Sequence, residues 1–167
     1  GTEMKLRTLE IALEGLEGFG RPDPRTEQYS TPAVLAARLL HHAYLLGDIE
    51  GRAVCDLGCG TGILACGAYL LGAGRVVGVE LDPDALTVAR RNTARLGAEI
   101  TLVPGDVRDS GLIKRLGPFD TVVMNPPFGA QNPHADRPFV DAALSLAPVM
   151  YGIFNTGSIP FLEVYTA

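Results

Sequence analysis

Val54-Cys55-Asp56-Leu57-Gly58-Cys59-Gly60-Thr61-Gly62-Ile63 is the stretch that decides the fold of this chain. An apolar run ends at Leu57, alternate glycines follow, and a second apolar segment begins at Ile63. That pattern is typical of a strand, a tight turn and a helix. Glycine has no Cβ and adopts positive φ, so Gly58 and Gly60 let the backbone pass close to a ligand. The stretch therefore predicts a ligand-binding turn.

From Arg52 onward the chain alternates between strand and helix patterns. We expect strands at 53–57, 76–80, 100–103, 121–124 and 149–154, and helices at 63–71, 84–96, 112–116 and 138–146. This alternation predicts an α/β fold, a doubly wound, Rossmann-like and mostly parallel sheet with helices on both faces. Regularly spaced leucines predict two amino-terminal helices, the second with Thr31 as its N-cap and Pro32 at its first position.

The composition predicts one packed domain in a reducing compartment. The 167 residues are 47% hydrophobic, yet no apolar run approaches the roughly 18 residues of a membrane span. The amino terminus lacks the apolar segment of a signal peptide, so we expect a cytoplasmic protein without membrane partners. We interpret residues 1–167 as a single domain, with a helical amino-terminal cap or lid at 1–50 and a Rossmann-like core at 51–154.

Metal binding and simple nucleic-acid binding are both disfavoured. Cys55, Cys59 and Cys66 have spacings that match no paired zinc-ligand pattern, so we expect no metal site. The net charge of -5 weighs against a protein whose affinity comes largely from phosphate neutralisation. The arginines at 90, 91 and 95 are either a solvated helix face or a local RNA contact.

Asn125-Pro126-Pro127-Phe128 follows the expected strand at 121–124. Two prolines remove backbone donors and stiffen the turn, which leaves its carbonyls free to accept hydrogen bonds. Asn125 adds an amide oxygen and Phe128 an apolar ring, a combination that suits a planar ring with an exocyclic amino group. The alternative is a proline turn that only ends a strand.

Acidic residues follow three of the expected strands. Glu80 lies 22 positions after Gly58, where a carboxylate can accept both hydroxyls of a ribose. Asp56 beside the glycine turn suits a cofactor with ammonium and sulfonium groups, or else only caps the turn. Asp106 is placed to accept from an adenine amino group with Val107 against the ring, the alternative for each acid being a solvated loop charge. The dinucleotide-binding motif has a glycine where this chain has Ile63, and the lysine of a P-loop is missing. The turn is therefore unlike the two common phosphate-binding motifs.

The block 54–128 resembles class I S-adenosylmethionine-dependent methyltransferases. In that class a glycine turn, an acidic end of the second strand, a Gly-Asp turn and an Asn-Pro-Pro-Phe motif follow one another in the same order as here. From about residue 6 to 154 the chain resembles more closely the archaeal and eukaryotic methyltransferase-like five family, which methylates adenine N6 in small-subunit ribosomal RNA. The motifs that carry this resemblance are Glu27-Gln28-Tyr29-Ser30-Thr31-Pro32, Asp56-Leu57-Gly58-Cys59-Gly60, Met124-Asn125-Pro126-Pro127-Phe128-Gly129 and His134-Ala135-Asp136-Arg137-Pro138-Phe139.

The resemblance implies S-adenosylmethionine as cofactor, bound by Gln28, Thr31, Gly58, Thr61, Ile63, Glu80, Asp106 and Val107. It further implies a lid at 28–31, an RNA substrate and a small zinc-binding activator subunit that pairs along the sheet edge. The small residues of 129–137 predict a mobile loop that closes on the target nucleotide. The family pattern continues into more sheet, so we expect a truncated carboxyl end. Other acceptors stay open: glutamine amides of proteins, guanine N2, or adenine in DNA. An inactive cofactor-binding subunit is the alternative from another class.

Overall fold

The computed structural model describes residues 3–18, 31–127, 135–156 and 159–166. Its elements are α1 (Leu6–Glu14), α2 (Ala33–Leu45), β1 (Ala53–Leu57), α3 (Ile63–Leu70), β2 (Arg75–Glu80), α4 (Pro83–Leu96), β3 (Thr101–Pro104), α5 (Ser110–Leu116), β4 (Thr121–Met124), α6 (Arg137–Leu146), β5 (Val149–Thr156) and β6 (Ile159–Thr166). The strands form one sheet in the order β3-β2-β1-β4-β5-β6. Strands β1 to β5 are parallel and β6 is antiparallel to β5. The predicted doubly wound α/β fold is confirmed.

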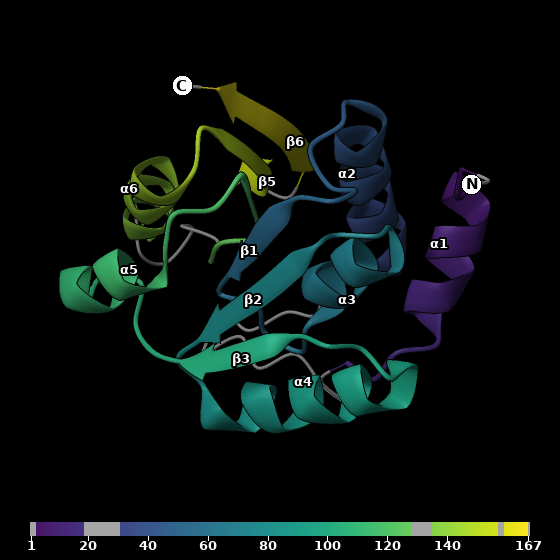
Figure 1. Ribbon diagram of the computed structural model, residues 1–167, viewed down its shortest axis with the longest axis horizontal. Helices are drawn as coiled ribbons and strands as arrows, with labels where there is room; N and C mark the ends of the chain where they lie inside the picture. Colours follow the sequence, from purple (N-terminus) through teal and green to yellow (C-terminus); the bar gives the residue numbers. More distant parts are fainter. Residues whose placement is uncertain (1–2, 19–30, 128–134, 157–158, 167) are drawn as a thin grey trace.

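Helices cover both faces of the sheet (Figure 1). Buried residues of α1, α2 and α3 share one apolar cluster with Val54, Val76 and Val123 of the sheet. Residues of α5 and α6 pack with the opposite side chains of β1, β2 and β4 in a second cluster. Successive side chains of a strand point to opposite faces, which is why β1 and β4 read as continuous apolar runs. The amino-terminal helices are therefore built into the same core as the sheet.

The loop between α2 and β1 ties the amino-terminal helices to the sheet. The backbone oxygen of Asp48 accepts a hydrogen bond from Thr121 Oγ1 at the start of β4, at 2.7 Å. The Asp48 carboxylate accepts another from the hydroxyl of Tyr151 in β5. Burial, followed by the contact with Asp48, raises the pKa of the Tyr151 phenol. These bonds lie at the end of the sheet where the parallel strands begin.

One local expectation is wrong, and one strand was not predicted. The helix after Thr31 has Pro32 as its N-cap, with extended backbone, and begins at Ala33. Thr31 lies two positions before the first helical residue and is not the N-cap, because Pro32 does not enter the helical conformation. The segment 159–166, for which we predicted no element, forms strand β6. A proline is tolerated there because β6 pairs only with β5 among the described strands.

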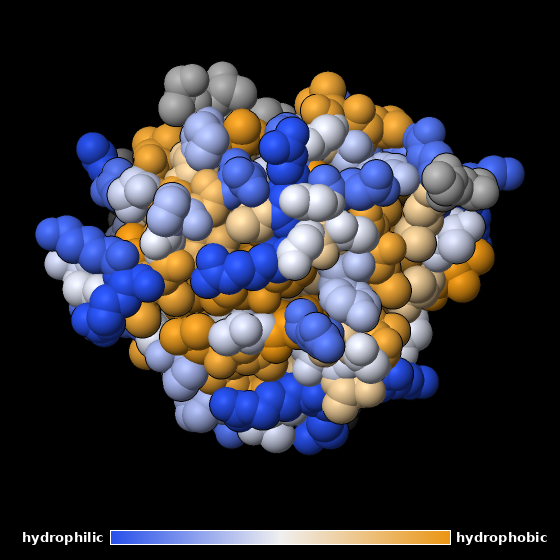
Figure 2. All heavy atoms as spheres, in the orientation of Figure 1, coloured by the Kyte–Doolittle hydropathy of each residue, from blue (hydrophilic) through white to orange (hydrophobic). Residues whose placement is uncertain are grey.

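The surface mixes polar and apolar residues. Figure 2 shows hydrophilic side chains interspersed with hydrophobic ones over the face seen in Figure 1. Large apolar side chains that are exposed occur singly or in pairs, including Leu45 and Leu46 at the end of α2 and Leu81 after β2. Within the described ranges, no helix has both the length and the apolar character needed to cross a membrane.

Candidate functional site

The carboxyl ends of β1 and β4 are adjacent, and the order of the sheet reverses between them. Open α/β sheets bind their ligands at this point. Leu57 and Met124 are register partners at the ends of these two strands. The glycine turn begins at the next residue on one strand and the Asn-Pro-Pro segment at the next residue on the other. The fold thus brings the two decisive motifs of the sequence side by side.

The glycine turn between β1 and α3 needs its glycines for two reasons. Gly58, Gly60 and Gly62 have φ values of 68°, 56° and 88°, which favour glycine. A Cβ added to Gly58 would lie 2.6 Å from the ring of Phe139 in α6, so this ring packs directly on the turn. A Cβ at Gly60 would meet no heavy atom within 4 Å, which leaves the backbone there accessible from the site.

Glu80 at the end of β2 holds this turn in place. Its Oε1 accepts a hydrogen bond from the Gly60 N–H at 2.8 Å, and its Oε2 accepts one from Asp82 N–H at 2.9 Å. The side chain is only partly buried. Each carboxylate oxygen accepts more than one hydrogen bond, so both keep capacity for a pair of hydroxyls. This arrangement fits the predicted contact with a ribose.

Asp56, the next acid, is buried beneath the turn with 1% of its surface exposed. Its Oδ2 accepts a hydrogen bond from Ala65 N–H in the first turn of α3 at 3.0 Å, which matches the capping alternative. Its Oδ1 is buried and has no partner among the described residues. Burial raises the pKa of Asp56 to about 8, against the lowering effect of the Ala65 bond and with a contribution from Glu80. A cation placed beside Oδ1 would satisfy this atom.

Asp106 after β3 is already paired in the structure. Both carboxylate oxygens accept hydrogen bonds from the Arg108 guanidinium, at 2.8 to 3.2 Å, and Oδ1 also accepts from the Arg108 N–H at 2.9 Å. These bonds lower the pKa of Asp106. The neighbouring Val107 is 9% exposed and belongs to the core. An adenine amino group would therefore share Asp106 with Arg108, a partner that the sequence did not indicate.

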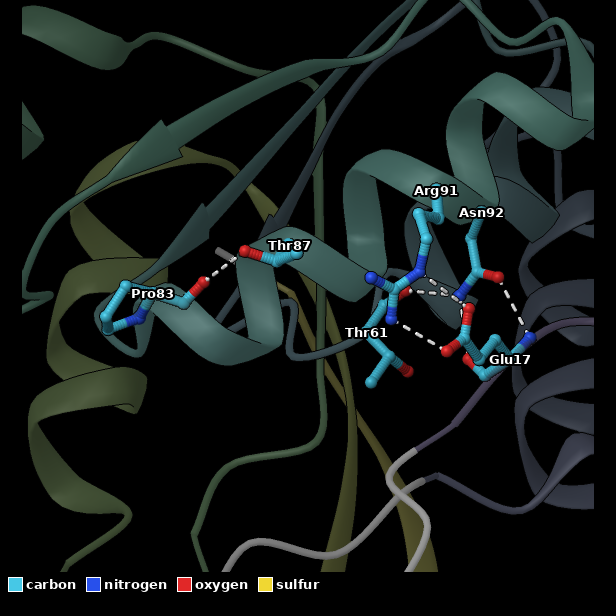
Figure 3. Close-up of polar contacts among 6 residues, drawn as sticks. All are labelled: Glu17, Thr61, Pro83, Thr87, Arg91 and Asn92. Atoms are coloured by element: carbon cyan, nitrogen blue, oxygen red, sulfur yellow. Dashed lines mark hydrogen bonds and ion pairs between the residues drawn. The ribbon is translucent and has the colours of Figure 1, made fainter.

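Thr61 and Ile63, which complete the expected cofactor set on this turn, are largely buried at 4% and 7% exposure. The Thr61 carbonyl accepts a hydrogen bond from Nδ2 of Asn92 in α4 at 2.8 Å. The same amide nitrogen donates to the carbonyl of Glu17, and Asn92 Oδ1 accepts from the Glu17 N–H. Figure 3 shows this junction. Asn92 thereby joins the glycine turn to the segment that follows α1.

Arg91 reinforces the same junction. Its guanidinium donates two hydrogen bonds to the Glu17 carboxylate, at 2.7 and 2.9 Å (Figure 3). The arginine remains about half exposed, with 55% side-chain accessibility. Sequence reasoning missed the roles of Asn92 and Glu17, because 75 positions separate them and neither lies in a recognisable motif. The pairing of Arg91 with Glu17 could not be predicted for the same reason, since 74 positions separate these two residues.

On the acceptor side, Asn125 is half-buried at the end of β4, with Pro126 buried and Pro127 half-buried behind it. Asn125 Nδ2 donates a hydrogen bond to Thr31 Oγ1 at 3.0 Å. Phe128 and Gln28, the other expected site residues of these segments, lie outside the described residues, as does His134. Within the described ranges, no group of three or more His, Cys, Asp or Glu side chains could hold a metal ion.

The residues at the carboxyl ends of these strands fit S-adenosylmethionine. The paired oxygens of Glu80 suit a ribose, and the unsatisfied Oδ1 of buried Asp56 suits a positively charged group. The accessible backbone at Gly60 gives a ligand room to approach the turn. The guanidinium of Arg108, beside this site, is already paired with Asp106 and is therefore engaged by a carboxylate.

Comparisons with known proteins agree with this geometry. A family model described as Methyltransferase small domain matches residues 33–148. The rRNA N(6)-adenosine-methyltransferase Mettl5 of Drosophila melanogaster is 41% identical over 164 residues, which cover 96% of this chain and 77% of that protein. The rRNA N(6)-adenosine-methyltransferase of Danio rerio is 38% identical over 159 residues, covering 93% of this chain and 76% of that protein.

A solved structure supports the same grouping. The crystal structure of a provisionally named RNA methyltransferase from Pyrococcus horikoshii superposes with a TM-score of 0.81 at 44% sequence identity. The superposition covers 92% of this chain and 72% of that chain. The two proteins therefore share their fold over most of this chain.

Proposed function

Because this chain belongs to the Methyltransferase small domain family, we propose that it methylates N6 of an adenine in small-subunit ribosomal RNA. Its cofactor is S-adenosylmethionine. The observation that carries the proposal is the register of β1 and β4, which sets Asn125-Pro126-Pro127 directly beside the glycine turn. The names of two relatives that share most of the chain supply the base and the kind of RNA.

Nine residues form the proposed cofactor site: Gln28, Asp56, Gly58, Gly60, Thr61, Ile63, Glu80, Asp106 and Val107. The sequence resemblance adds Thr31, whose hydroxyl contacts Asn125 in the structure. Glu80 would bind the ribose hydroxyls, and Asp106 the adenine amino group beside Val107. Asp56 would accept from the ammonium group through Oδ1, the oxygen that lacks a partner in the structure. Because the pKa of this acid is raised to about 8, that contact would be accompanied by release of a proton from Asp56 at neutral pH.

Asn125, Pro126, Pro127 and Phe128 form the proposed acceptor site. S-adenosylmethionine supplies an electrophilic methyl group. The Asn125 side-chain oxygen and the Pro126 carbonyl would accept the two hydrogens of the adenine amine, turning the nitrogen lone pair toward that methyl. Alignment of this kind is the main demand of the reaction, so no strong general base is required. Phe128 would stack on the base, a contact worth roughly 1 to 3 kcal/mol.

Mass spectrometry of nucleosides tests the function directly. Small-subunit ribosomal RNA is prepared from cells with and without the intact gene, and N6-methyladenosine is quantified in each. We expect the modified nucleoside to fall in the cells that lack the protein and to return with the wild-type gene. An unchanged level would refute the proposed substrate.

A methyl-transfer assay in solution separates the remaining acceptors. Radiolabelled S-adenosylmethionine is incubated with the protein and either small ribosomal subunits, a peptide release factor or duplex DNA. Label in adenine of ribosomal RNA supports the proposal, whereas label in guanine, in glutamine or in DNA assigns the site to one of the alternatives. Absence of transfer to any of them would favour an inactive subunit.

We also propose a small zinc-binding activator and a cytoplasmic location. The edge of β3 supports the first, because β3 pairs only with β2 among the described strands and leaves backbone groups for another strand. The net charge of -5 supports it too, since a partner could supply the positive charge that RNA binding requires. Co-expression followed by size-exclusion chromatography tests the partner, and migration of the two proteins in separate fractions would count against it.

A further inference from the structure

The hydrogen bond between Asn125 and Thr31 joins the proposed acceptor site to a residue 94 positions earlier in the chain. The amide nitrogen Nδ2 of Asn125 is the donor and the hydroxyl oxygen of Thr31 is the acceptor, at 3.0 Å. The bond is partly buried, so water competes with it less than at the surface. Thr31 therefore contacts a residue of the proposed acceptor site directly.

Both partners lie on stiff supports. Thr31 precedes Pro32 and Asn125 precedes Pro126, and a residue before proline is largely confined to extended backbone. Immediately after Pro32, α2 begins, with the Pro32 carbonyl accepting from Ala36 N–H at 3.0 Å. Immediately before Asn125, every residue of β4 is buried. Because Thr is β-branched, its side chain also has few rotamers. The fold thus fixes where the hydroxyl and the amide meet.

A primary amide needs such a contact to present one particular atom. Its oxygen and nitrogen lie on two branches of similar size, so packing alone distinguishes them poorly. A threonine hydroxyl can accept from Nδ2 or donate to Oδ1, and in this structure the Thr31 hydroxyl accepts from Nδ2. With Nδ2 bonded to Thr31, Oδ1 lies on the other branch of the amide, and within the described ranges it has no hydrogen-bond donor. The reversed amide would direct N–H groups at the hydrogens of an amine, where donor faces donor.

We infer that Thr31 is a positioning residue that turns the Asn125 amide so that Oδ1 accepts from the amino group of the methyl acceptor. This inference rests on the proposed function and deepens it. It gives Thr31 a role different from the cofactor contact that sequence resemblance implies. A cofactor contact acts on the affinity for S-adenosylmethionine, whereas a contact that orients Asn125 acts on turnover once the cofactor is bound.

Two substitutions isolate the hydroxyl group. Thr31→Val keeps the shape of the side chain and removes the hydroxyl, and Thr31→Ser keeps the hydroxyl. Turnover is measured on small ribosomal subunits, and the cofactor dissociation constant by titration calorimetry. We expect Thr31→Val to lower kcat by about three- to tenfold, the scale of one neutral hydrogen bond, with cofactor affinity within about twofold of wild type. Thr31→Ser should recover most of the turnover.

A double-mutant cycle shows whether the effect passes through Asn125. In an Asn125→Ala background, Thr31→Val should change kcat by less than about twofold, because the group it orients is absent. An equal loss in both backgrounds would overturn the inference. So would an unchanged kcat with weaker cofactor binding, or equal loss of turnover in the valine and serine variants.

A spectroscopic measurement keeps this test independent of the substrate. The side-chain amide signals of Asn125 in a ¹⁵N NMR spectrum are assigned by their disappearance in Asn125→Ala. Thr31→Val should shift these signals and speed the exchange of their protons with water, and Thr31→Ser should not. Unaltered signals in Thr31→Val would overturn the inference that Thr31 orients Asn125, even if RNA methylation is found. Altered signals without RNA methylation would support that inference and refute only the proposed function.

Discussion

Side chains at the ends of β1 and β2 are bonded to residues close to them in the chain, whereas the side chain that follows β4 is bonded to a distant residue. Glu80 is bonded to Gly60, 20 positions away, and Asp56 to Ala65, 9 positions away. Asn125 is bonded to Thr31, 94 positions away. Asp56, Glu80 and the glycine turn are therefore held to one another by bonds within residues 56–80, whereas the Asn125 amide is held by a residue of the amino-terminal region. Cofactor binding and turnover should accordingly respond to different substitutions.

The largest expected effect is on the cofactor side. Glu80→Ala removes the acceptor of the Gly60 hydrogen bond and the proposed acceptor for the ribose hydroxyls, so we expect cofactor affinity to fall about 10- to 100-fold by titration calorimetry. The exposed Glu99, changed to alanine, is the matched control for loss of one negative charge. Equal affinities for the two variants would contradict the assignment of Glu80.

On the acceptor side, Asn125→Ala should lower turnover at least about tenfold while cofactor affinity stays nearly intact. The reason is that the amide oxygen is needed only when the acceptor amine is bound. Steady-state turnover on ribosomal subunits and titration of S-adenosylmethionine together check this expectation. A variant with full turnover would remove Asn125 from the acceptor site.

Gly58→Ala sharpens the comparison where the two sides meet. The substitution introduces a Cβ at positive φ and displaces the ring of Phe139, so we expect cofactor affinity to fall by about fivefold. Gly97→Ala is the control, since Gly97 also has positive φ, at 63°, but a Cβ there would meet nothing within 4 Å. If both variants bind the cofactor equally well, the Phe139 contact has no part in the site.

Asp56→Asn should have the smallest effect at mildly acidic pH, because the buried carboxyl is already protonated there. The raised pKa of about 8 means that Asp56 contributes stability which is fully present below its unfolded pKa, near 3.8, and is lost as the pH rises through about 8. Urea unfolding of both proteins between pH 5 and 9 measures this. The wild type should lose stability relative to the variant as pH rises, and a constant difference would contradict the shifted pKa.

Local patterns in the sequence predicted much of the fold. β1 and β4 lie where their apolar runs placed them, at 53–57 and 121–124, because parallel strands buried on both faces leave a continuous apolar signal. β6 was not predicted, since its strand identity comes from antiparallel pairing with β5 and its sequence contains Pro160. The remaining boundaries differ by one or two residues.

The site, like the fold, could be predicted where its residues belong to one local motif and not where they are distant in the chain. Glu80 and the glycine turn lie within one recognisable motif, so their proximity could be predicted from spacing. Thr31 was expected to cap α2, and only the folded chain shows its hydroxyl against Asn125. Asn92 gave no signal, because a lone asparagine within a helix reads as a surface residue until its carbonyl partners, at Glu17 and Thr61, are in place.

Helix α2 is joined to strand β4 at both ends. Thr31, before the helix, is bonded to Asn125 after the strand, and Asp48, after the helix, is bonded to Thr121 at the start of the strand. A protein engineer who deletes the first 50 residues would remove both attachments at once. We therefore expect the segment 51–154 to be a poor minimal enzyme, and fusion partners to be tolerated better before α1 than between α2 and β1.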